Sequence, residues 1–308
     1  VTGFPNTRLD EVFLGNSYQK DSRPTGQNNI SRRASAFTSL NYTYNRRYLA
    51  DFSFNVDGST QFGARNRYAP FWAAGVGWNL HEENFMSDLS RKAINRFKIR
   101  VGIGTTGNQQ FPPFMGISTY QYNTSQDYLG MLGASLMGYG NESLRWQQTL
   151  KRNLGADISL LNDRIGVRID AYLETTNDLL LDINTPPSLG VNSYKENVGR
   201  LQNKGIEGNI NIFILRNMEK STTWSVFFNG IHNQNKIVEI SNSLKKMNRE
   251  NDASRNPDGS FKQTTPQLRF EEGQSVNAIW AVRSAGIDPS NGKEVFIRPN
   301  GDITYDWN

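Results

Sequence analysis

The chain has 308 residues, of which 36% are hydrophobic and 20% are charged, a length that allows one large domain or two ordinary ones. Its net charge of +5 is spread too thinly along the sequence to indicate a nucleic-acid partner. The absence of cysteine excludes disulfides and thiolate metal sites, and no apolar run approaches the roughly 18 residues that a membrane-spanning helix needs.

Residues 1–30 carry glycine, proline and asparagine without a sustained period, so this stretch is expected to be a loop. A hairpin over 33–57 follows. Apolar side chains fill most even positions of both arms, and polar side chains fill most odd positions. Because side chains alternate faces along a strand, this pattern predicts one apolar face and one polar face. Only Asn45 and Arg46 are expected to separate the arms, which predicts a tight antiparallel turn.

The same alternation predicts further strands along the chain. Some glycines fall on the polar side of these strands, where they leave space for close packing. The predicted strands cover 72–80, 96–105, 144–160, 165–174, 206–214 and 224–230, with a last strand near 276–285.

Connections of two kinds alternate along the predicted strands. The short ones cover 45–46, 81–91, 161–164 and 216–221, and the long ones cover 59–69, 107–143, 177–203 and 236–275. This alternation is typical of an all-β, antiparallel, up-and-down transmembrane barrel with short periplasmic turns and long extracellular loops. The mean hydropathy of −0.62 is compatible with such a barrel, because its strands alternate. A soluble β-sandwich is the alternative, and the length of the strands favours the barrel.

The sequence contains no motif that indicates catalysis or cofactor binding with any specificity. Residues 102–107 spell GxGxxG after a strand, but the prolines at 112 and 113 forbid the helix that a dinucleotide site needs. His81 and His232 are far apart, without metal-ligand spacing. The acidic pairs 82–83 and 271–272 are expected to be solvated. We therefore expect neither an enzyme nor a cofactor or metal site.

Five ordered stretches between about residues 40 and 210 resemble SusC/RagA-type TonB-linked outer-membrane proteins. Their family patterns are RYL…DGSSRFG, GW…E.FM, LKLR.SYG.TGNQ, NP.LKWE and N.G…NKGIE. The matching stretches here are 47–63, 71–86, 97–109, 141–146 and 197–207. Trp72 and Gln147 depart from the patterns, and the family's late acidic loop is eroded at 298–302.

The resemblance implies a 22-stranded barrel plugged in its lumen, of which residues 31–308 would supply about 8–10 strands and residues 1–30 an extracellular loop. It also implies that the signal peptide, the TonB box and the plug domain lie outside this chain. An open part-barrel would leave unpaired edges in lipid, so the native molecule is expected to be longer.

The resemblance further implies an importer in the outer membrane of a Gram-negative cell, in contact with outer-membrane lipid. Its partners would be a SusD-like surface lipoprotein and TonB, and its substrates oligosaccharides or oligopeptides. A passive porin or siderophore-type receptor is the alternative within the same barrel class.

Two sets of residues are candidate sites. The polar face is expected to line the lumen and to meet the plug through Arg33, Arg47, Asp51, Asn55, Arg96, Lys98, Arg100, Asp157, Arg168, Asp170, Glu174 and Glu207. Aromatic side chains stack on sugars and peptides alike, so the longest loop is expected to contact substrate or partner, or to pack on the rim. These loop residues are Phe111, Phe114, Tyr120, Tyr122, Tyr128 and Tyr139.

Overall fold

The fold is taken from a computed structural model of the chain. It describes residues 30–62, 66–86, 93–108, 114–129, 131–185, 190–217, 221–253, 269–281, 283–298 and 301–305, together with 4, 7–8, 14–15 and 188. Most of the predicted loop over 1–30 lies outside the described residues, as does Phe111.

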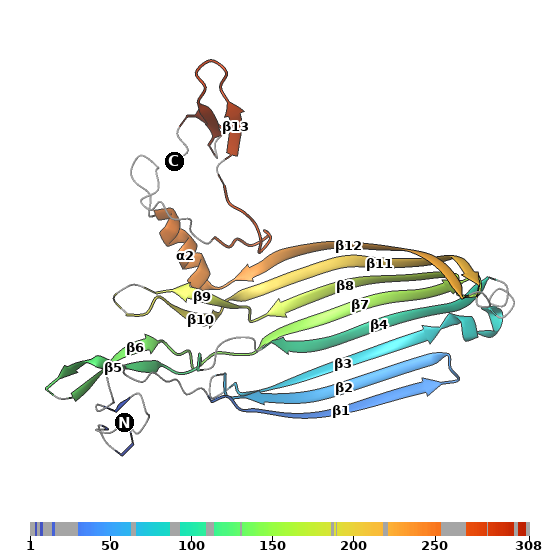
Figure 1. Cartoon of the computed structure of the whole chain (residues 1–308), viewed down its shortest axis with the longest axis horizontal. Helices are drawn as coiled ribbons and strands as arrows, with labels where there is room; N and C mark the ends of the chain where they lie inside the picture. Colours follow the sequence, from blue (N-terminus) through green and yellow to red (C-terminus); the bar gives the residue numbers. More distant parts are fainter. Residues whose placement is uncertain are drawn as a thin grey trace.

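One antiparallel sheet of eight strands forms the body of the molecule (Figure 1). Neighbours in sequence are neighbours in space apart from two pairs of short strands in the loops, which gives the predicted meander. The strand order is β1 (Arg33–Tyr44), β2 (Tyr48–Ser59), β3 (Tyr68–Asn79), β4 (Ile94–Asn108), β7 (Gln147–Leu160), β8 (Ile165–Asn177), β11 (Gly199–Asn217) and β12 (Thr222–Ile240). The barrel is not closed in this chain, because β1 and β12 stand at opposite ends of the sheet.

The first turn is one residue longer than predicted. Tyr44 pairs with Tyr48, so Arg47 belongs to the turn together with Asn45 and Arg46, both of which have positive φ. A two-residue turn would have paired even positions with odd ones and set apolar side chains opposite polar ones. The longer turn keeps the apolar positions of both arms on one face, so the hydrophobic pattern decides the register.

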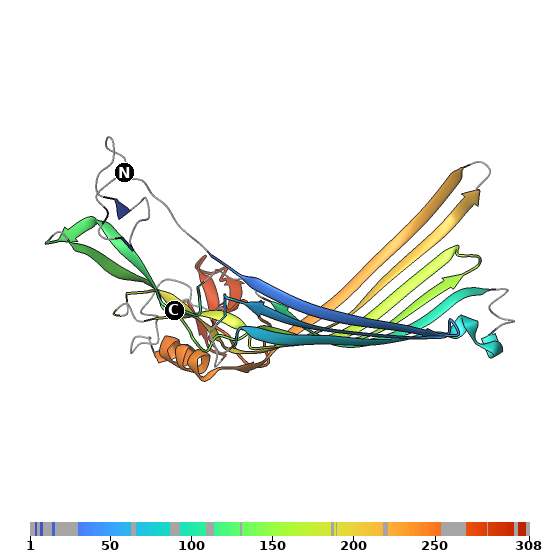
Figure 2. The same cartoon turned by 90° about the horizontal axis from the view of Figure 1, so that it is seen from below.

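Short turns gather at one end of the sheet, the turn end, and long connections at the other, the loop end (Figures 1 and 2). Two of the long connections contain short strands of their own. The connection between β4 and β7 contains the hairpin β5 (Thr119–Tyr128) and β6 (Met131–Gly138), and the next one contains β9 (Leu180–Asn184) and β10 (Ser193–Asn197). β12 continues to Ile240, and helix α2 (Asn242–Ala253) follows it. The turn end has two 3-10 turns, η2 (Leu80–Glu82) and η3 (Asn84–Met86).

The predicted last strand over 276–285 is shifted. Residues 276–281 are irregular, and β13 (Arg283–Ile287) pairs with β14 (Glu294–Ile297), which pairs with β15 (Ile303–Thr304). These three strands form a sheet separate from the main one. The turn after β13 is held by Asp288, and hydrogen bonds from Ser290 and then Tyr305 lower the pKa of its carboxyl to about 2.

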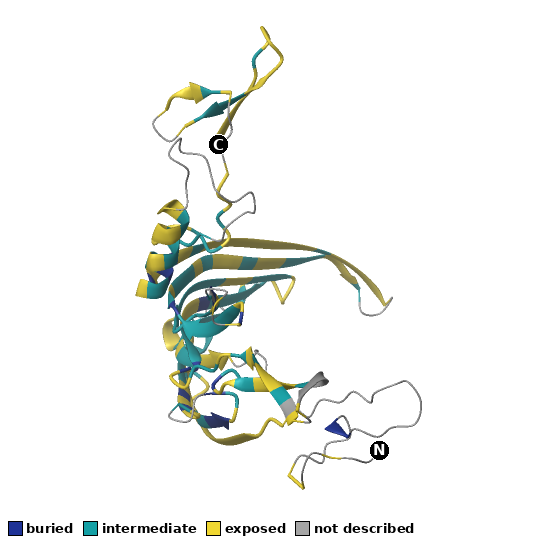
Figure 3. Cartoon of the chain, turned by 90° about the vertical axis from the view of Figure 1, so that its left-hand side faces the viewer, coloured by how far each residue is buried: buried dark blue, intermediate teal, exposed yellow. Residues whose placement is uncertain are grey.

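Buried side chains are few and lie near the loop end (Figure 3). One cluster joins Phe62, Ala69, Phe71 and Trp146. The other joins Ile183, Val198, Ile237, Ile240 and Leu244, and so packs β9, β12 and α2 together. The long middle of the sheet has no second layer against either face in the described residues, and this is the main departure from a soluble fold.

Candidate functional site

The polar face of the sheet carries rows of side chains that register across the strands. One row runs from Arg100 through Gly155 and Asp170 to Glu207. The next row toward the turn end runs from Lys98 through Asp157 to Arg168. Cross-strand neighbours of opposite sign are thus set side by side, which is the arrangement that stabilises a sheet electrostatically.

Arg100 is the centre of an ion-pair network in these rows. Its guanidinium donates to Asp157 at 2.8 Å and to Asp170 at 2.9 Å, and Arg168 donates to Asp157 at 2.8 Å. Gly155 lies between Arg100 and Asp170, and a Cβ on it would meet the Asp170 carboxylate and lie 2.8 Å from the Arg100 guanidinium. The missing side chain of Gly155 is therefore what lets Arg100 reach the aspartate one strand further on.

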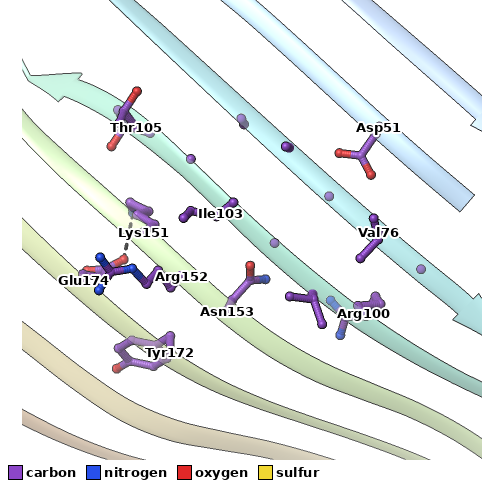
Figure 4. Close-up of a pocket in the computed structure, with 18 of the residues that line it drawn as sticks. Asp51, Val76, Arg100, Ile103, Thr105, Lys151, Arg152, Asn153, Tyr172 and Glu174 are labelled. Atoms are coloured by element: carbon purple, nitrogen blue, oxygen red, sulfur yellow. Dashed lines mark ion pairs between the residues drawn. The ribbon is translucent and has the colours of Figure 1, made fainter.

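A hollow of about 710 Å³ opens above the middle of the polar face (Figure 4). Gly75 and Gly102 form part of its floor, and the polar side chains of neighbouring strands lean over them: a Cβ on Gly75 would lie 2.6 Å from the Asp51 carboxylate. Lys151 and Glu174, 2.9 Å apart, line the same hollow with Asn153 and Tyr172. Polar and apolar residues both line the hollow, and it is open to solvent.

The structure separates the predicted polar-face residues into three groups. Arg100, Asp157, Arg168, Asp170 and Glu174 are joined in ion pairs. Asp51, Asn55, Arg96, Lys98 and Glu207 lie at polar-face register positions, and the four charged ones have no ion pair within the described residues. Two others lie at the strand ends: Arg33 is 3.4 Å from Asp57 near the loop end, and Arg47 lies in the first turn.

The predicted aromatic loop residues do not form one cluster. Tyr120 and Tyr122 lie on β5 opposite Leu136 and Ala134, and both are exposed. Phe114 is half-buried in the turn before β5, with φ of 69°. The side chain of Tyr128 lies outside the described part of the structure, as does Phe111. Among the loop aromatics whose side chains the structure describes, Tyr139 alone has a ring contact: it meets Tyr194 of β10 edge-on, with centroids 6.1 Å apart.

Tyr194 connects three of the loop-end segments. Its hydroxyl donates to Glu196 at 2.8 Å, and Ser243 of α2 donates to the other oxygen of the same carboxylate at 3.0 Å. Burial, followed by the hydrogen bond to Glu196, raises the pKa of Tyr194 to about 12. The tyrosine is therefore a neutral donor at physiological pH that ties β10 to α2, with Tyr139 packed against it.

The motif residues of the turn end converge on one carboxylate, which the sequence pattern alone did not single out. Glu83 accepts hydrogen bonds from the Tyr48 hydroxyl at 2.7 Å and the Trp78 indole at 3.0 Å. Arg47 approaches the same carboxylate at 3.4 Å and donates to Asn84 at 2.7 Å. The expectation that Glu83 is solvated is wrong: its side chain is only 11% exposed, because three donors from two of the motif stretches surround it.

The motif residues of the loop end also converge. Phe62 stacks on Trp146 with ring centroids 4.1 Å apart, and the Trp146 indole donates to the carbonyl of Arg67 at 3.3 Å. Asn197 donates to the carbonyls of Arg145 and Asp178 at 3.1 and 2.9 Å. These motifs therefore hold the loop-end connections against each other, and their role in this chain is structural.

The apolar face carries exposed large side chains on each strand of the main sheet, beside others such as Ile99 and Leu173 that are partly buried. Leu40, Val76, Leu154, Ile206 and Phe228 are between 55% and 67% exposed although they occupy the predicted apolar positions of five different strands. A contiguous apolar surface of this size needs an apolar environment.

The apolar band crosses the strands obliquely. One row of paired residues runs from Tyr42 on β1 through Val76 on β3 to Ile206 on β11 and His232 on β12. On β1 the apolar positions continue from this row toward the loop end, but on β12 they continue toward the turn end. An oblique band of this kind is what strands tilted by about 45° in a bilayer produce.

Within the described residues, no helix is long and apolar enough to cross a membrane. No three His, Cys, Asp or Glu side chains of that part of the chain lie close enough together to hold a metal ion.

Comparison with known families and proteins agrees with this geometry. The family described as TonB dependent receptor-like, beta-barrel matches residues 3–276. TonB-dependent receptor P39 of Formosa agariphila is 31% identical over 280 residues, which cover 89% of this chain and 25% of that protein. TonB-dependent receptor SusC of Bacteroides thetaiotaomicron is 29% identical over 294 residues, covering 87% of this chain and 28% of SusC.

Solved structures give the same fold. A chain of the RagAB peptide transporter superposes with a TM-score of 0.77 at 24% identity, covering 99% of this chain and 32% of that one. RagAB in its closed-closed state gives 0.76 at 22% identity. The chain thus spans about a quarter of the curated relatives' length and about a third of the solved chains' length.

Proposed function

The chain belongs to the TonB-dependent receptor-like β-barrel family, and we propose that it supplies adjacent strands of an outer-membrane importer for oligosaccharides or oligopeptides. The family places it in the outer membrane, and its relatives are named as TonB-dependent receptors. The observation that carries the proposal is the combination of an exposed, oblique apolar band on one face with a solvated, charged hollow on the other.

The polar face would line the lumen. Its charges are mixed and largely paired, so the wall around Arg100 is nearly neutral and does not act as a filter for one sign of charge. The carboxylates of Asp51 and Glu207 and the cations of Arg96 and Lys98 have no ion pair in the described residues, and they would meet a plug domain outside this chain. TonB would act on that plug.

The loop end would face the outside of the cell and meet a SusD-like surface lipoprotein. The β5–β6 hairpin projects from the loop end (Figure 2) and exposes Tyr120 and Tyr122 on one face. An isolated two-stranded hairpin is marginally stable in water, so a partner that covers this face would stabilise it. The likeness of this chain to chains of the RagAB peptide importer supports a partner of this kind.

Uptake measurements test the proposed function. Cells that make the full-length protein are given labelled oligosaccharides or oligopeptides, with and without collapse of the proton-motive force. Uptake that requires both the protein and the force is expected, and a strain lacking the gene is the control. Uptake that continues when the force is collapsed would contradict the proposal and favour a passive porin.

Deleting residues 111–139 from the full-length protein tests the partner surface. The deletion removes the β5–β6 hairpin while leaving the β4–β7 ladder, so the barrel is expected to form and co-purification of the lipoprotein to fall. Heat-modifiable gel mobility verifies that the barrel has folded. Unchanged complex formation by the deleted protein would contradict the assignment of this loop.

A further inference from the structure

Three cations lie on the apolar face near the loop-side edge of the apolar band. Arg152 on β7 is two residues before Leu154 and Lys204 on β11 is two residues before Ile206, in both cases on the loop side. Lys236 on β12 pairs with Gln202, next to the Lys204 pair with Gln234. The register places these three side chains on the same face as the band. Lys204 and Lys236 lie at its loop-side edge on β11 and β12, and Arg152 lies just inside that edge on β7, between the register partners Ile103 and Leu173.

These cations are exposed and have no ion pair within the described residues. The carboxylates nearest in the register are engaged elsewhere: Glu174 pairs with Lys151 on the polar face, and Glu239, further along β12, is 3.6 Å from Arg200. The positive charge of the cluster is therefore not neutralised by this part of the chain.

The spacing of the cluster suits one ligand with several anionic groups. Lys204 and Lys236 are diagonal neighbours on adjacent strands, about 7–8 Å apart between backbones. Arg152 and Lys204 are separated by one strand, β8, and so by about 10 Å. Long lysine and arginine side chains cover such gaps while their apolar stems stay against the band.

We infer that Arg152, Lys204 and Lys236 bind the headgroup phosphates of the phosphorylated glycolipid that forms the outer leaflet of the outer membrane. This inference rests on the proposed function, because that function puts the loop end outside the cell. A ligand at this position must present an anion at the edge of the hydrocarbon layer and acyl chains along the band below it. Free phosphate lacks the acyl chains, so the lipid is the ligand that fits both surfaces.

The test compares two lipids and two matched triple variants of the full-length protein. The first variant combines Arg152→Gln, Lys204→Gln and Lys236→Gln. The control variant combines Lys246→Gln, Arg283→Gln and Lys293→Gln, three exposed cations outside the main sheet. Dissociation constants are measured in detergent for lipid A and for dephosphorylated lipid A, on protein whose heat-modifiable mobility shows a folded barrel.

The wild-type protein and the control variant are expected to prefer the phosphorylated lipid. The first variant is expected to lose about tenfold to a hundredfold in affinity for that lipid and little for the dephosphorylated one, because each cation near an anionic surface contributes about 1 kcal/mol. Equal affinity of the wild-type protein for both lipids, or an unchanged preference in the first variant, would overturn the inference.

Two further measurements show whether a negative result contradicts the lipid assignment or the proposed function. Inorganic phosphate at the lipid's concentration is expected not to displace it, and displacement would overturn the assignment to a lipid. Uptake through the first variant is expected to match wild type. Lipid binding needs only the folded barrel. A wild-type protein that imports normally but shows no preference for the phosphorylated lipid would contradict the inference alone, whereas absent uptake by the wild-type protein would contradict the proposed function alone.

Discussion

At the scale of single residues, two groups illustrate how local chemistry depends on long-range register. Glu83 lies in the turn after β3, and the hydrogen-bond donors to its carboxylate, Tyr48 and Trp78, come from the neighbouring strands β2 and β3. Arg100 reaches Asp170 only because the residue between them in the row is glycine. In both cases the identity of one residue has meaning only through residues that the sheet brings beside it.

Replacing Glu83 with glutamine should remove a pH-dependent contribution to stability. Hydrogen bonds from Tyr48 and then Trp78 lower the pKa of the Glu83 carboxyl below its ordinary 4.5. Its contribution is therefore complete above about pH 5 and is lost as the pH falls through the lowered pKa. We expect wild type to melt higher than Glu83→Gln at neutral pH and the gap to close in acid.

Melting curves between pH 3 and pH 7 on the detergent-solubilised full-length protein check this expectation. Glu82→Gln is the matched control. The Glu82 side chain is more exposed than that of Glu83, and its ion pair with His81 is long at 3.8 Å, so the effect of this substitution should be smaller. If the difference in melting temperature between wild type and Glu83→Gln stays constant down to pH 3, the carboxylate does not act through its charge.

Replacing Gly155 with valine should disrupt the Arg100 network. The new side chain would occupy the space through which Arg100 reaches Asp170, leaving that partly buried carboxylate without its cation. We expect a loss of about 1–3 kcal/mol in the free energy of unfolding. Gly166→Ala is the control, because nothing lies within 4 Å of its added Cβ. Equal denaturant midpoints for the two variants would argue against the network.

At the scale of elements, the loop-end connections are held by packing across long sequence distances. Phe62 lies in the connection between β2 and β3, and Trp146 lies at the end of the connection between β4 and β7. Their stacked rings hold these two connections together. The second cluster does the same for β9, β12 and α2. Loops built in this way keep a defined shape above the barrel, which suits them to hold a partner.

Replacing Trp146 with alanine should destabilise this arrangement. The side chain is 4% exposed, and removal of a buried aromatic ring costs about 3–5 kcal/mol. Proteolysis of the loop end in the folded protein should become faster, together with a lower melting temperature. Phe85→Ala, at a residue that is 71% exposed, serves as the control and should change neither measurement appreciably. Unchanged protection in Trp146→Ala would contradict the role of the cluster.

At the scale of the whole molecule, the exposed apolar face and the two sheet ends point to a larger assembly. The strands of the main sheet are 12 to 19 residues long, beyond what a bilayer requires. The sheet ends at β1 and β12, and in lipid such edges must be paired by further strands. The share of the relatives' length that the chain covers is consistent with this requirement.

Arginine introduced on the two faces of one strand should separate a lipid-facing surface from a solvated one. Ala50 and Ser53 both lie on β2 and both are exposed, but on opposite faces. Ala50→Arg should cost about 1–2 kcal/mol in lipid, because Ala50 lies toward the turn-side edge of the band, and Ser53→Arg should cost less. Unfolding of the full-length protein from lipid vesicles gives the two values. Equal costs would contradict the lipid assignment of the apolar face.

The sequence by itself determined the eight strands of the main sheet, their faces, the alternation of turns and loops, and the family, but not the short strands in the connections or the C-terminal sheet. It could do so because alternation of side chains and turn chemistry are local properties, and because family motifs occupy short stretches. The tertiary structure decided the other features. These are the oblique course of the apolar band, the three donors around Glu83, the ion pair that Arg100 makes with Asp170 across Gly155, and the cationic cluster near the loop-side edge of the band. Each depends on the register between strands that are distant in sequence, and one residue of turn length at Arg47 was enough to change that register.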